Sequence, residues 1–271
     1  MTHTKSSLSA LLAQHDLSPS RALGQNFVVD PNTVRRIARL AKVGAGDFVL
    51  EIGAGLGSLT MALLETGATV EAMEVDRHLI SPLRDVVEPL GAKVHHADAL
   101  HANYDEILAG RATVLVANLP YNIATPLVLH LLETVVDIQR MLVMVQLEVA
   151  ERLAAHAHDD AYGAASVRVA YFADAHVVGK VAASVFLPRP RVESALVEIV
   201  RRDEVAVSTD LVSEAEIFEL VRTSFQQRRK MLRRSLAGLV SEEAFARAHI
   251  DATRRPEELS LEEFARLAQF R

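Results

Sequence analysis

Four consecutive residues, Asn118-Leu119-Pro120-Tyr121, combine groups suited to holding a flat aromatic amine. The exocyclic amine of a nucleobase is a poor nucleophile because its lone pair is delocalised into the ring. The side-chain carbonyl of Asn118 and a backbone carbonyl of the loop can accept its two hydrogens, which favours the pyramidal amine. Pro120 lacks an N–H and stiffens the loop, and Tyr121 offers a stacking face worth roughly 1–3 kcal/mol per base. The run therefore predicts a catalytic loop that works mainly by alignment.

Three glycines follow the β-rich run 47–52 with the spacing G-x-G-x-G, at Gly53, Gly55 and Gly57. Glycine lets the backbone turn sharply and approach a ligand closely before a helix begins. The spacing differs from the G-x-G-x-x-G of the dinucleotide fingerprint, which gives less support to a pyrophosphate cradle. The glycines therefore indicate a ligand loop of another kind.

A carboxylate stands at or just beyond the end of each of the next two β-rich runs. Glu74 can accept hydrogen bonds from both hydroxyls of a ribose. Asp98 can hold an exocyclic amine. With the glycine loop, these acids predict a pocket for an adenosine whose 5′ substituent is not a phosphate. S-adenosylmethionine is the expected cofactor, and an NAD-type cofactor is the alternative.

Three histidines, His95, His96 and His101, lie close together in the sequence and suggest a metal site. Adjacent residues on a strand point to opposite faces of the sheet, so His95 and His96 make poor joint ligands. The chain has no cysteine, which excludes cysteine-ligated zinc. We interpret the histidines as structural and expect no metal.

The elements that must position these residues follow an alternating pattern. Strands are expected at residues 47–52, 69–75, 92–96, 113–117 and 140–146. Between them, for example over 59–66 and 126–135, apolar residues recur with helical spacing. This alternation is typical of an α/β fold with a mostly parallel sheet and helices on both faces. Such sheets bind ligands at the carboxyl ends of their strands, where strand order reverses.

The chain of 271 residues exceeds the usual size of one domain. Residues 1–203 are expected to form a Rossmann-like domain that binds S-adenosylmethionine and carries the catalytic loop. Residues 204–271 are expected to form a small all-α domain, because the pattern is helical from residue 213 onward.

The formal net charge of −6 argues mildly against a nucleic-acid partner, but the charge is unevenly distributed. The stretch of thirteen residues 222–234 contains no acidic residue. It holds six basic side chains, namely Arg222, Arg228, Arg229, Lys230, Arg233 and Arg234. Such a local field attracts phosphates. A solvated helix face is the usual alternative for a run of charge, and the lack of balancing acids disfavours it here.

A helical wheel treats this basic run as one continuous helix. Apolar residues fall on one stripe of that wheel, namely Val221, Phe225, Leu232, Leu236 and Leu239. Most of the basic residues occupy an adjacent arc that is expected to face RNA. Arg228 falls inside the apolar stripe, so it should extend to solvent or find a carboxylate partner.

These motifs together give the chain a family resemblance over nearly its whole length. They include Leu23-Gly24-Gln25-Asn26-Phe27-Val28, the Gly53 loop, Glu74, Asp98, Asn118 to Tyr121, the Pro-rich segment Phe186 to Ser194 and the basic segment Arg228 to Ser235. The chain resembles the ribosomal RNA adenine dimethyltransferases, most closely the bacterial branch that acts on 16S rRNA. That branch dimethylates N6 of two adjacent adenines near the 3′ end.

The resemblance implies roles for individual residues. The cofactor contacts of the family fall on Asn26, Val28, Gly53, Glu74, Asp98 and Asn118, and we add Gly55 from the glycine loop. It implies that the Asn26 segment folds over the cofactor and that Phe186 forms a second wall against the base. Ala54 and Ala124 replace a proline and a serine common in the family, and neither change removes a group that the chemistry needs.

Other functions remain open at this stage. The related methyltransferases of macrolide resistance act on adenine in 23S rRNA, and DNA adenine methylases share this style of loop. A non-enzymatic ribosome-assembly factor could keep the fold without the activity. The expected partner is 16S rRNA in the small ribosomal subunit or its precursor, and the protein is expected to be monomeric. No stretch approaches the roughly 20 apolar residues of a membrane span, so a cytoplasmic protein without membrane contact is expected.

Overall fold

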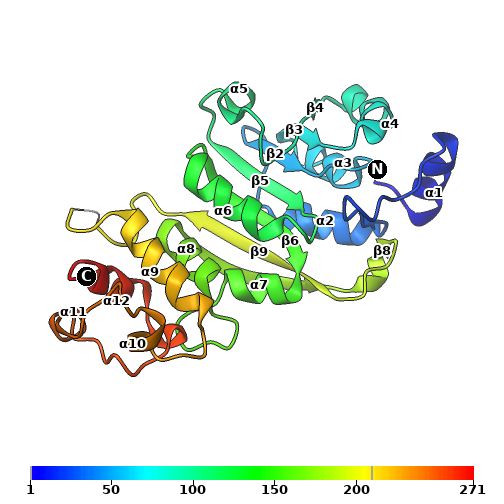
Figure 1. Ribbon diagram of the computed structural model, residues 1–271. Coiled ribbons are helices and arrows are strands. Elements are labelled where there is room, and N and C mark those ends of the chain that lie inside the picture. Colours follow the sequence, from blue (N-terminus) through cyan, green and yellow to red (C-terminus); the bar gives the residue numbers. More distant parts are fainter. Residues whose placement is uncertain (1, 209) are drawn as a thin grey trace. The chain divides into compact units, whose positions relative to one another are not determined.

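A computed structural model describes residues 2–208 and 210–271 of the chain (Figure 1). The chain forms two compact units. The N-terminal unit comprises Met1–Ala150 and His176–Val200, and the C-terminal unit comprises Glu151–Ala175 and Arg201–Arg271. Residues 151–175 thus group with the C-terminal helices, because the helix in this segment packs against two of them. The division into two domains between residues 203 and 204 stays a prediction.

The N-terminal unit is built on a seven-stranded sheet of order β4-β3-β2-β5-β6-β9-β7. The strands are β2 (Phe48–Ile52), β3 (Thr69–Glu74), β4 (Lys93–His96), β5 (Thr113–Asn118), β6 (Ile138–Gln146), β7 (Ala173–Val181) and β9 (Ser194–Arg201). Strands β2 to β6 pair in parallel, and β9 pairs antiparallel with β6. Strand order reverses at β2, which lies between β3 and β5. The loops after β2 and β5 are therefore neighbours.

Helices cover both faces of this sheet, as the mostly parallel strands require. They are α2 (Pro31–Leu40), α3 (Ser58–Leu64), α4 (Arg77–Val87), α5 (Tyr104–Leu108), α6 (Ala124–Thr134) and α7 (Leu147–Leu153), with short 3-10 turns η1 (Glu88–Leu90) and η2 (Ala183–Val185). Helices α2 and α3 pack on Val49 and Val70, and α4 packs on Ala72 of the same sheet face. Every residue of β2 is buried. The predicted α/β, Rossmann-like class is confirmed.

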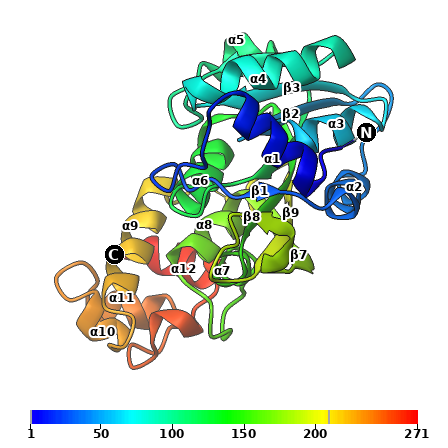
Figure 2. The same ribbon diagram turned by 90° about the vertical axis from the view of Figure 1, so that its right-hand side faces the viewer.

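An N-terminal arm, whose helix and short strand the sequence pattern did not predict, completes this unit. Helix α1 (Lys5–Gln14) buries Leu8 and Leu12 in a cluster with Phe27 and Leu56. Strand β1 (Phe27–Val28) then pairs antiparallel with β8 (Phe186–Leu187), so the two segments lie side by side (Figure 2). This pairing brings the start of the Pro-rich segment next to the Asn26 segment.

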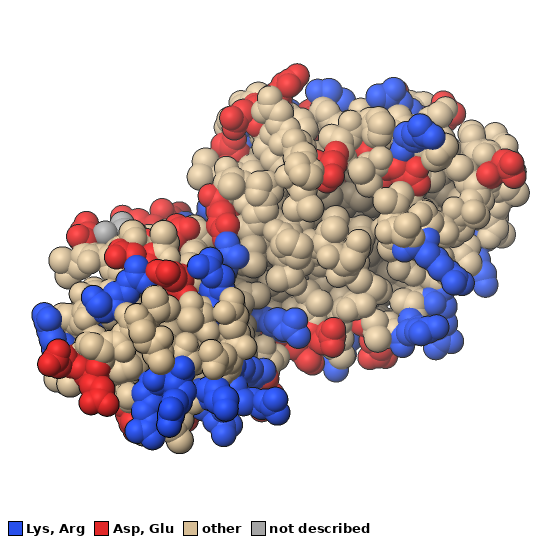
Figure 3. Space-filling view, viewed as in Figure 1, with Lys and Arg blue, Asp and Glu red and all other residues tan. Residues whose placement is uncertain are grey.

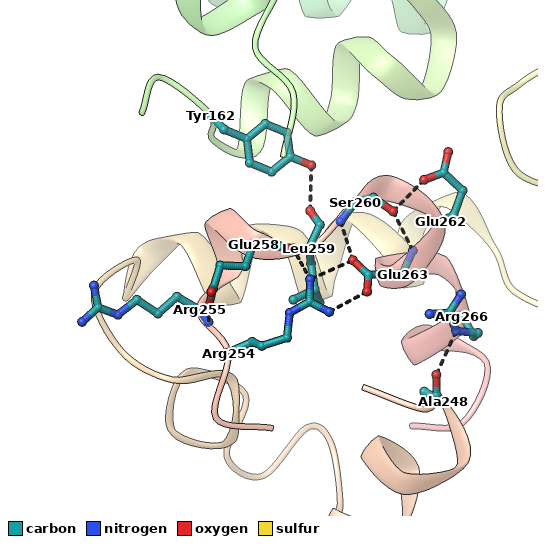
Figure 4. A network of polar contacts seen from close by, with 10 residues as sticks. All are labelled: Tyr162, Ala248, Arg254, Arg255, Glu258, Leu259, Ser260, Glu262, Glu263 and Arg266. Atoms are coloured by element: carbon teal, nitrogen blue, oxygen red, sulfur yellow. Dashed lines mark hydrogen bonds and ion pairs between the residues drawn. The ribbon is translucent and has the colours of Figure 1, made fainter. Parts of the chain in front are cut away.

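The C-terminal unit is helical. Its helices are α8 (Ala164–Phe172), α9 (Glu214–Gln226), α10 (Leu232–Ser235), α11 (Glu242–Arg247) and α12 (Leu261–Ala268), with the 3-10 turn η3 (Pro256–Glu258). Helix α12 begins with a capping box in which Ser260 and Glu263 exchange hydrogen bonds. Arg254 donates to both carboxylate oxygens of Glu263, and the Tyr162 hydroxyl donates to the Leu259 carbonyl (Figure 4). These polar contacts fix the loop before α12.

Candidate functional site

A pocket opens at the carboxyl ends of β2, β3 and β5, where the strand order reverses. It gathers every residue predicted to bind the cofactor, namely Asn26, Val28, Gly53, Gly55, Glu74, Asp98 and Asn118. The predicted catalytic residues Leu119, Pro120 and Tyr121 line the same pocket. The chemistry-bearing loops therefore meet at the edge of the sheet that the strand pattern indicated.

The glycine loop has a backbone that only glycine adopts readily. Gly53, Gly55 and Gly57 have φ angles of 76°, 58° and 82°, all in the left-handed region. A Cβ atom on Gly55 would lie 2.9 Å from the Phe27 ring, and one on Gly53 would lie 3.4 Å from the Asn118 carbonyl oxygen. The loop therefore packs between the N-terminal arm and the catalytic loop, with no room for larger residues at Gly55.

Glu74 is buried at the end of β3, with 6% of its surface exposed. Its carboxylate accepts hydrogen bonds from the backbone N–H groups of Gly55 (2.8 Å), Val75 (3.0 Å) and Asp76 (2.9 Å). Burial raises the pKa of Glu74, and these hydrogen bonds oppose the rise. These hydrogen bonds fix the side chain against the glycine loop, and its ribose-binding role stays a prediction.

Asp98 lies in the turn after β4. Hydrogen bonds from the Leu100 backbone N–H and from His101, each at 3.0 Å, lower the pKa of Asp98, so this carboxylate is ionised at neutral pH. The buried Tyr104 hydroxyl donates to the Ala99 carbonyl at 2.7 Å. Tyr104 therefore holds the turn that carries Asp98.

The three histidines have separate contacts. His95 Nε2 lies 2.5 Å from a Glu71 carboxylate oxygen, and His96 Nε2 lies 3.2 Å from the Val75 carbonyl oxygen. His101 contacts Asp98 instead. Among the described residues, no group of three or more His, Cys, Asp or Glu side chains could hold a metal ion.

Glu51 is a pocket residue that the sequence reasoning missed. It lies on β2, lines the pocket and is only 1% exposed. Its carboxyl accepts a hydrogen bond of 2.5 Å from the Thr60 hydroxyl. Burial raises the pKa of Glu51 to about 8, although the Thr60 hydrogen bond opposes this. The sequence signal for this residue was a single acidic side chain within the otherwise apolar run Phe48–Ile52.

Asn118 ends strand β5, and its amide orientation is determined by its partner. Its Nδ2 donates to the Asn26 carbonyl oxygen at 3.0 Å. Because a backbone carbonyl can only accept, the amide nitrogen must face Asn26. The Oδ1 atom is then left to accept a hydrogen bond from a ligand. This geometry leaves room for the acceptor role of Asn118, which stays a prediction.

The rest of the catalytic loop is anchored on both sides. Leu119 is buried, and its N–H donates to the Met144 carbonyl at 3.1 Å. Pro120 packs near Gly24 of the N-terminal arm. The Tyr121 hydroxyl lies 3.0 Å from the Ser194 hydroxyl, and burial raises the pKa of Tyr121. Ser194, at the end of the Pro-rich segment, therefore fixes the ring of Tyr121.

Phe186 occupies a different environment from the one predicted. Its ring is 4% exposed and packs in a hydrophobic cluster with Val28 and Val34. Stacking on a base would require the ring to leave this cluster. A substrate role for Phe186 therefore stays a prediction.

Comparison with known proteins assigns the chain to a family. The family model described as ribosomal RNA adenine dimethylase matches residues 18–271. A protein of Streptomyces coelicolor named ribosomal RNA small subunit methyltransferase A is 44% identical over 96% of this chain and 93% of its own length. The protein of the same name from Thermobifida fusca is 43% identical over 99% of this chain and 96% of its own length. The chain belongs to the ribosomal RNA adenine dimethylase family.

Solved structures agree with the fold of this adenine dimethylase. A dimethyladenosine transferase from Plasmodium falciparum has a TM-score of 0.74 at 24% identity, covering 88% of this chain and 94% of that one. The 23S rRNA methyltransferase ErmE has a TM-score of 0.70, also at 24% identity, covering 90% of this chain and 99% of that one. At this identity the likeness concerns the fold alone.

The basic run of this adenine dimethylase is not one helix, which corrects the helical-wheel prediction. Helix α9 ends at Gln226 and helix α10 begins only at Leu232. The intervening chain turns because the Leu232 N–H donates to the Arg254 carbonyl at 2.8 Å. Arg228 donates to the Glu257 carboxylate at 3.0 Å, so the expected carboxylate partner is confirmed.

The basic side chains predicted to contact RNA are all exposed, and they lie in the C-terminal unit. Four of them line a shallow depression together with Arg255 and Thr253, namely Arg229, Lys230, Arg233 and Arg234. Glu257 and Glu258 also border it. Arg222 lies apart on α9. Lys and Arg side chains gather along the lower edge of this unit in Figure 3.

No helix among the described residues is long and apolar enough to cross a membrane.

Proposed function

We propose that this adenine dimethylase transfers methyl groups from S-adenosylmethionine to N6 of two adjacent adenines near the 3′ end of 16S rRNA. The family assignment supports adenine in ribosomal RNA as the substrate. The names of the bacterial relatives support the small subunit. We further propose a cytoplasmic protein that acts as a monomer.

The pocket fits an adenosine-containing cofactor. Positive φ angles at Gly53 and Gly55 open the backbone for close approach. In this proposal buried Glu74 accepts from the ribose hydroxyls, and ionised Asp98 accepts from the adenine amine; the burial of Glu74 and the lowered pKa of Asp98 support these roles. S-adenosylmethionine, when bound, supplies an already activated methyl group, so no strong base is needed.

The observation that carries the proposal is the orientation of the Asn118 amide. With Nδ2 held by the Asn26 carbonyl, Oδ1 is placed to accept one amine hydrogen of the target base. A carbonyl of the Pro120 loop accepts the other. Tyr121 stacks on the base, and its contact with Ser194 keeps the ring in place. Catalysis by this loop consists of alignment and of holding the amine pyramidal.

The basic depression supports an RNA substrate. Arg229, Lys230 and Arg233 gather positive charge in this depression, although they do not lie on one continuous helix. Contacts between such side chains and phosphates position a nucleic acid without reading its sequence. The target adenine must also leave its stack to reach the pocket.

The decisive experiment compares the two ribosomal subunits. Small and large subunits from a strain that lacks this methylation are incubated with the protein and methyl-labelled S-adenosylmethionine. Label in 16S rRNA as N6,N6-dimethyladenosine at two neighbouring positions is the expected result. Label only in 23S rRNA would support the resistance-type activity, and no label with retained subunit binding would support a non-enzymatic assembly factor.

A further inference from the structure

Gln25 connects two parts of the N-terminal unit that are far apart in sequence. Its Oε1 accepts a hydrogen bond from the Ser20 N–H at 2.7 Å, and its Nε2 donates to an Asp76 carboxylate oxygen at 2.7 Å. The Gln25 N–H also donates to the Ser20 carbonyl at 3.0 Å. One side-chain amide thus shapes the turn at residues 20–25 and ties it to the end of β3.

The segment that Gln25 holds, residues 20–28, borders both halves of the pocket. Gly24 packs near Pro120, and the Asn26 carbonyl accepts from Asn118. Phe27 lies against Gly55 of the glycine loop. The segment therefore touches the cofactor loop on one side and the catalytic loop on the other, and we call it the cover segment.

Asp76 connects Gln25 to the proposed ribose acid. Its other carboxylate oxygen accepts from the His78 N–H at 3.0 Å and caps helix α4, and its own N–H donates to Glu74 at 2.9 Å. A chain of hydrogen bonds therefore runs from Ser20 through Gln25 and Asp76 to Glu74. The position of the cover segment and the position of Glu74 are coupled through these contacts.

We propose that Gln25 is a positioning residue that latches the cover segment over the bound cofactor through Asp76. The latch sets how fast the cofactor enters and leaves, and it keeps the Asn26 carbonyl aligned with Asn118. Gln25 lines the pocket in which the cofactor would lie. The inference rests on the proposed function for the identity of the ligand, but the latch itself is a property of the protein.

The chemistry of the two contacts requires an amide at position 25. Its oxygen faces an N–H donor, and its nitrogen faces a carboxylate acceptor. Glutamate would keep the first contact and place two carboxylates together at the second, which is repulsive. Replacing Asp76 with asparagine would restore a donor at this point while keeping an N-cap, because asparagine caps helices as well as aspartate does.

The test therefore uses Gln25→Ala, Gln25→Glu, Asp76→Asn and the double exchange Gln25→Glu with Asp76→Asn. Binding and release of S-adenosylhomocysteine are measured by calorimetry and stopped flow, since this probe occupies the site without turnover. Trypsin cleavage after exposed Arg21, followed by mass spectrometry, reports opening of the cover segment without any ligand. Gln139→Glu is the matched control, because Gln139 is exposed and its Nε2 donates only locally to the Val136 carbonyl among the hydrogen bonds described.

Gln25→Ala and Gln25→Glu are expected to release the probe about tenfold faster and to be cut faster after Arg21. The double exchange is expected to return both rates to within about threefold of the wild-type values. Gln139→Glu should behave as wild type. Unfolding temperatures identify any variant that is globally destabilised. If Gln25→Glu is destabilised by its added charge, Gln25→Ala, which adds none, is used for the test.

Unchanged release and unchanged Arg21 cleavage in Gln25→Ala and in Gln25→Glu would overturn the latch. A double exchange as impaired as Gln25→Glu would also overturn it, because Asp76 would then not be the partner. A wild-type protein that binds neither S-adenosylhomocysteine nor S-adenosylmethionine would overturn the proposed function instead. In that case Arg21 cleavage still tests the latch on its own.

Discussion

The Asn118 amide nitrogen donates to the Asn26 carbonyl at 3.0 Å, across 92 positions of sequence. This one hydrogen bond joins the catalytic loop to the cover segment and determines which way the amide points. The orientation of the Asn118 side chain therefore depends on a residue of the N-terminal arm, which makes the arm part of the proposed active site.

The first prediction concerns Asn118 itself. Asn118→Ala removes the acceptor for the amine and should lower kcat by about a hundredfold or more, since a small misalignment already costs this much. Asn118→Asp should be similarly impaired, because its carboxylate would face the Asn26 carbonyl. RNA binding, measured by filter retention of small subunits, should be unchanged in both. Near-normal methylation by Asn118→Ala would remove this residue from its assigned role.

The second prediction concerns the contact between the glycine loop and Phe27. Gly55→Ala should lower the free energy of unfolding by roughly 1–3 kcal/mol from backbone strain. It should also weaken cofactor binding, because the new Cβ atom would press on the Phe27 ring at 2.9 Å.

Gly110→Ala is the control for backbone strain. Gly110 has a φ of 72°, and a Cβ atom there would meet no described atom within 4 Å. It should lose stability without losing cofactor affinity. Equal cofactor affinity in the two variants would show that the Phe27 contact is unimportant.

Most of the cofactor pocket could be predicted from the sequence because of a topological rule. Gly53, Glu74, Asp98 and Asn118 each stand at or just beyond the end of a β-rich run, and parallel strands bring their carboxyl ends together. The alternation of such runs with helical stretches is a local pattern, so it can be read without knowing any long-range contact.

The features that could not be predicted depend on distant pairings. The β1–β8 pairing, the Gln25–Asp76 hydrogen bond and the end of α9 at Gln226 each involve partners remote in sequence or outside the periodic pattern. A helical wheel cannot predict that the Leu232 N–H donates to the carbonyl of Arg254, a residue 22 positions away. Local periodicity therefore predicted the strands and missed the helix and strand of the arm that lines the pocket.

The third prediction concerns Tyr104, whose hydroxyl holds the Asp98 turn through the Ala99 carbonyl. Tyr104→Phe leaves that carbonyl unpaired and should cost about 1 kcal/mol of stability. It should also raise the dissociation constant for S-adenosylhomocysteine, because Asp98 is no longer fixed. Calorimetric titration and thermal unfolding measure the two effects.

Tyr162→Phe is a matched control for this variant. The buried Tyr162 hydroxyl donates to the Leu259 carbonyl at 3.0 Å in the C-terminal unit. Burial raises the pKa of both tyrosines, so the two hydroxyls are lost from comparable surroundings. Tyr162→Phe should lose similar stability with unchanged cofactor affinity. Weakened cofactor binding by both variants would indicate a general loss of structure.

The fourth prediction concerns the basic depression. Replacing Arg229, Lys230 and Arg233 with glutamine should weaken RNA binding and reduce the slope of log affinity against log salt by about two to three. Arg35, Arg39 and Arg84 form a matched triple on the N-terminal unit. Arg35 and Arg84 stand in exposed ion pairs that contribute little to stability, and Arg39 is exposed. An unchanged affinity and salt slope in the first triple would mean that the depression does not bind RNA.

The fifth prediction concerns the pH dependence of stability. The pKa of Glu51 rises to about 8 on folding because the carboxyl is buried, whereas an unfolded glutamate ionises near pH 4.5. Between these values the folded state keeps a proton that the unfolded state has lost. The contribution of Glu51 to stability is therefore intact below pH 4.5. It falls by roughly 1 kcal/mol per pH unit as the pH rises to about 8, and is constant above that.

Glu51→Gln should remove this slope, because glutamine stays neutral and can still accept from Thr60. The variant should therefore be more stable than the wild type at pH 8 and similar to it at pH 4.5, as measured by urea unfolding across the pH range. Glu71 is the control of opposite sign. Burial opposes its ionisation, but hydrogen bonds from His95 and Arg111 hold its pKa below the usual value. Glu71→Gln should therefore lose stability above pH 4.5 and show no gain at pH 8. A Glu51→Gln variant that keeps the wild-type slope would mean that Glu51 is ionised in the folded pocket.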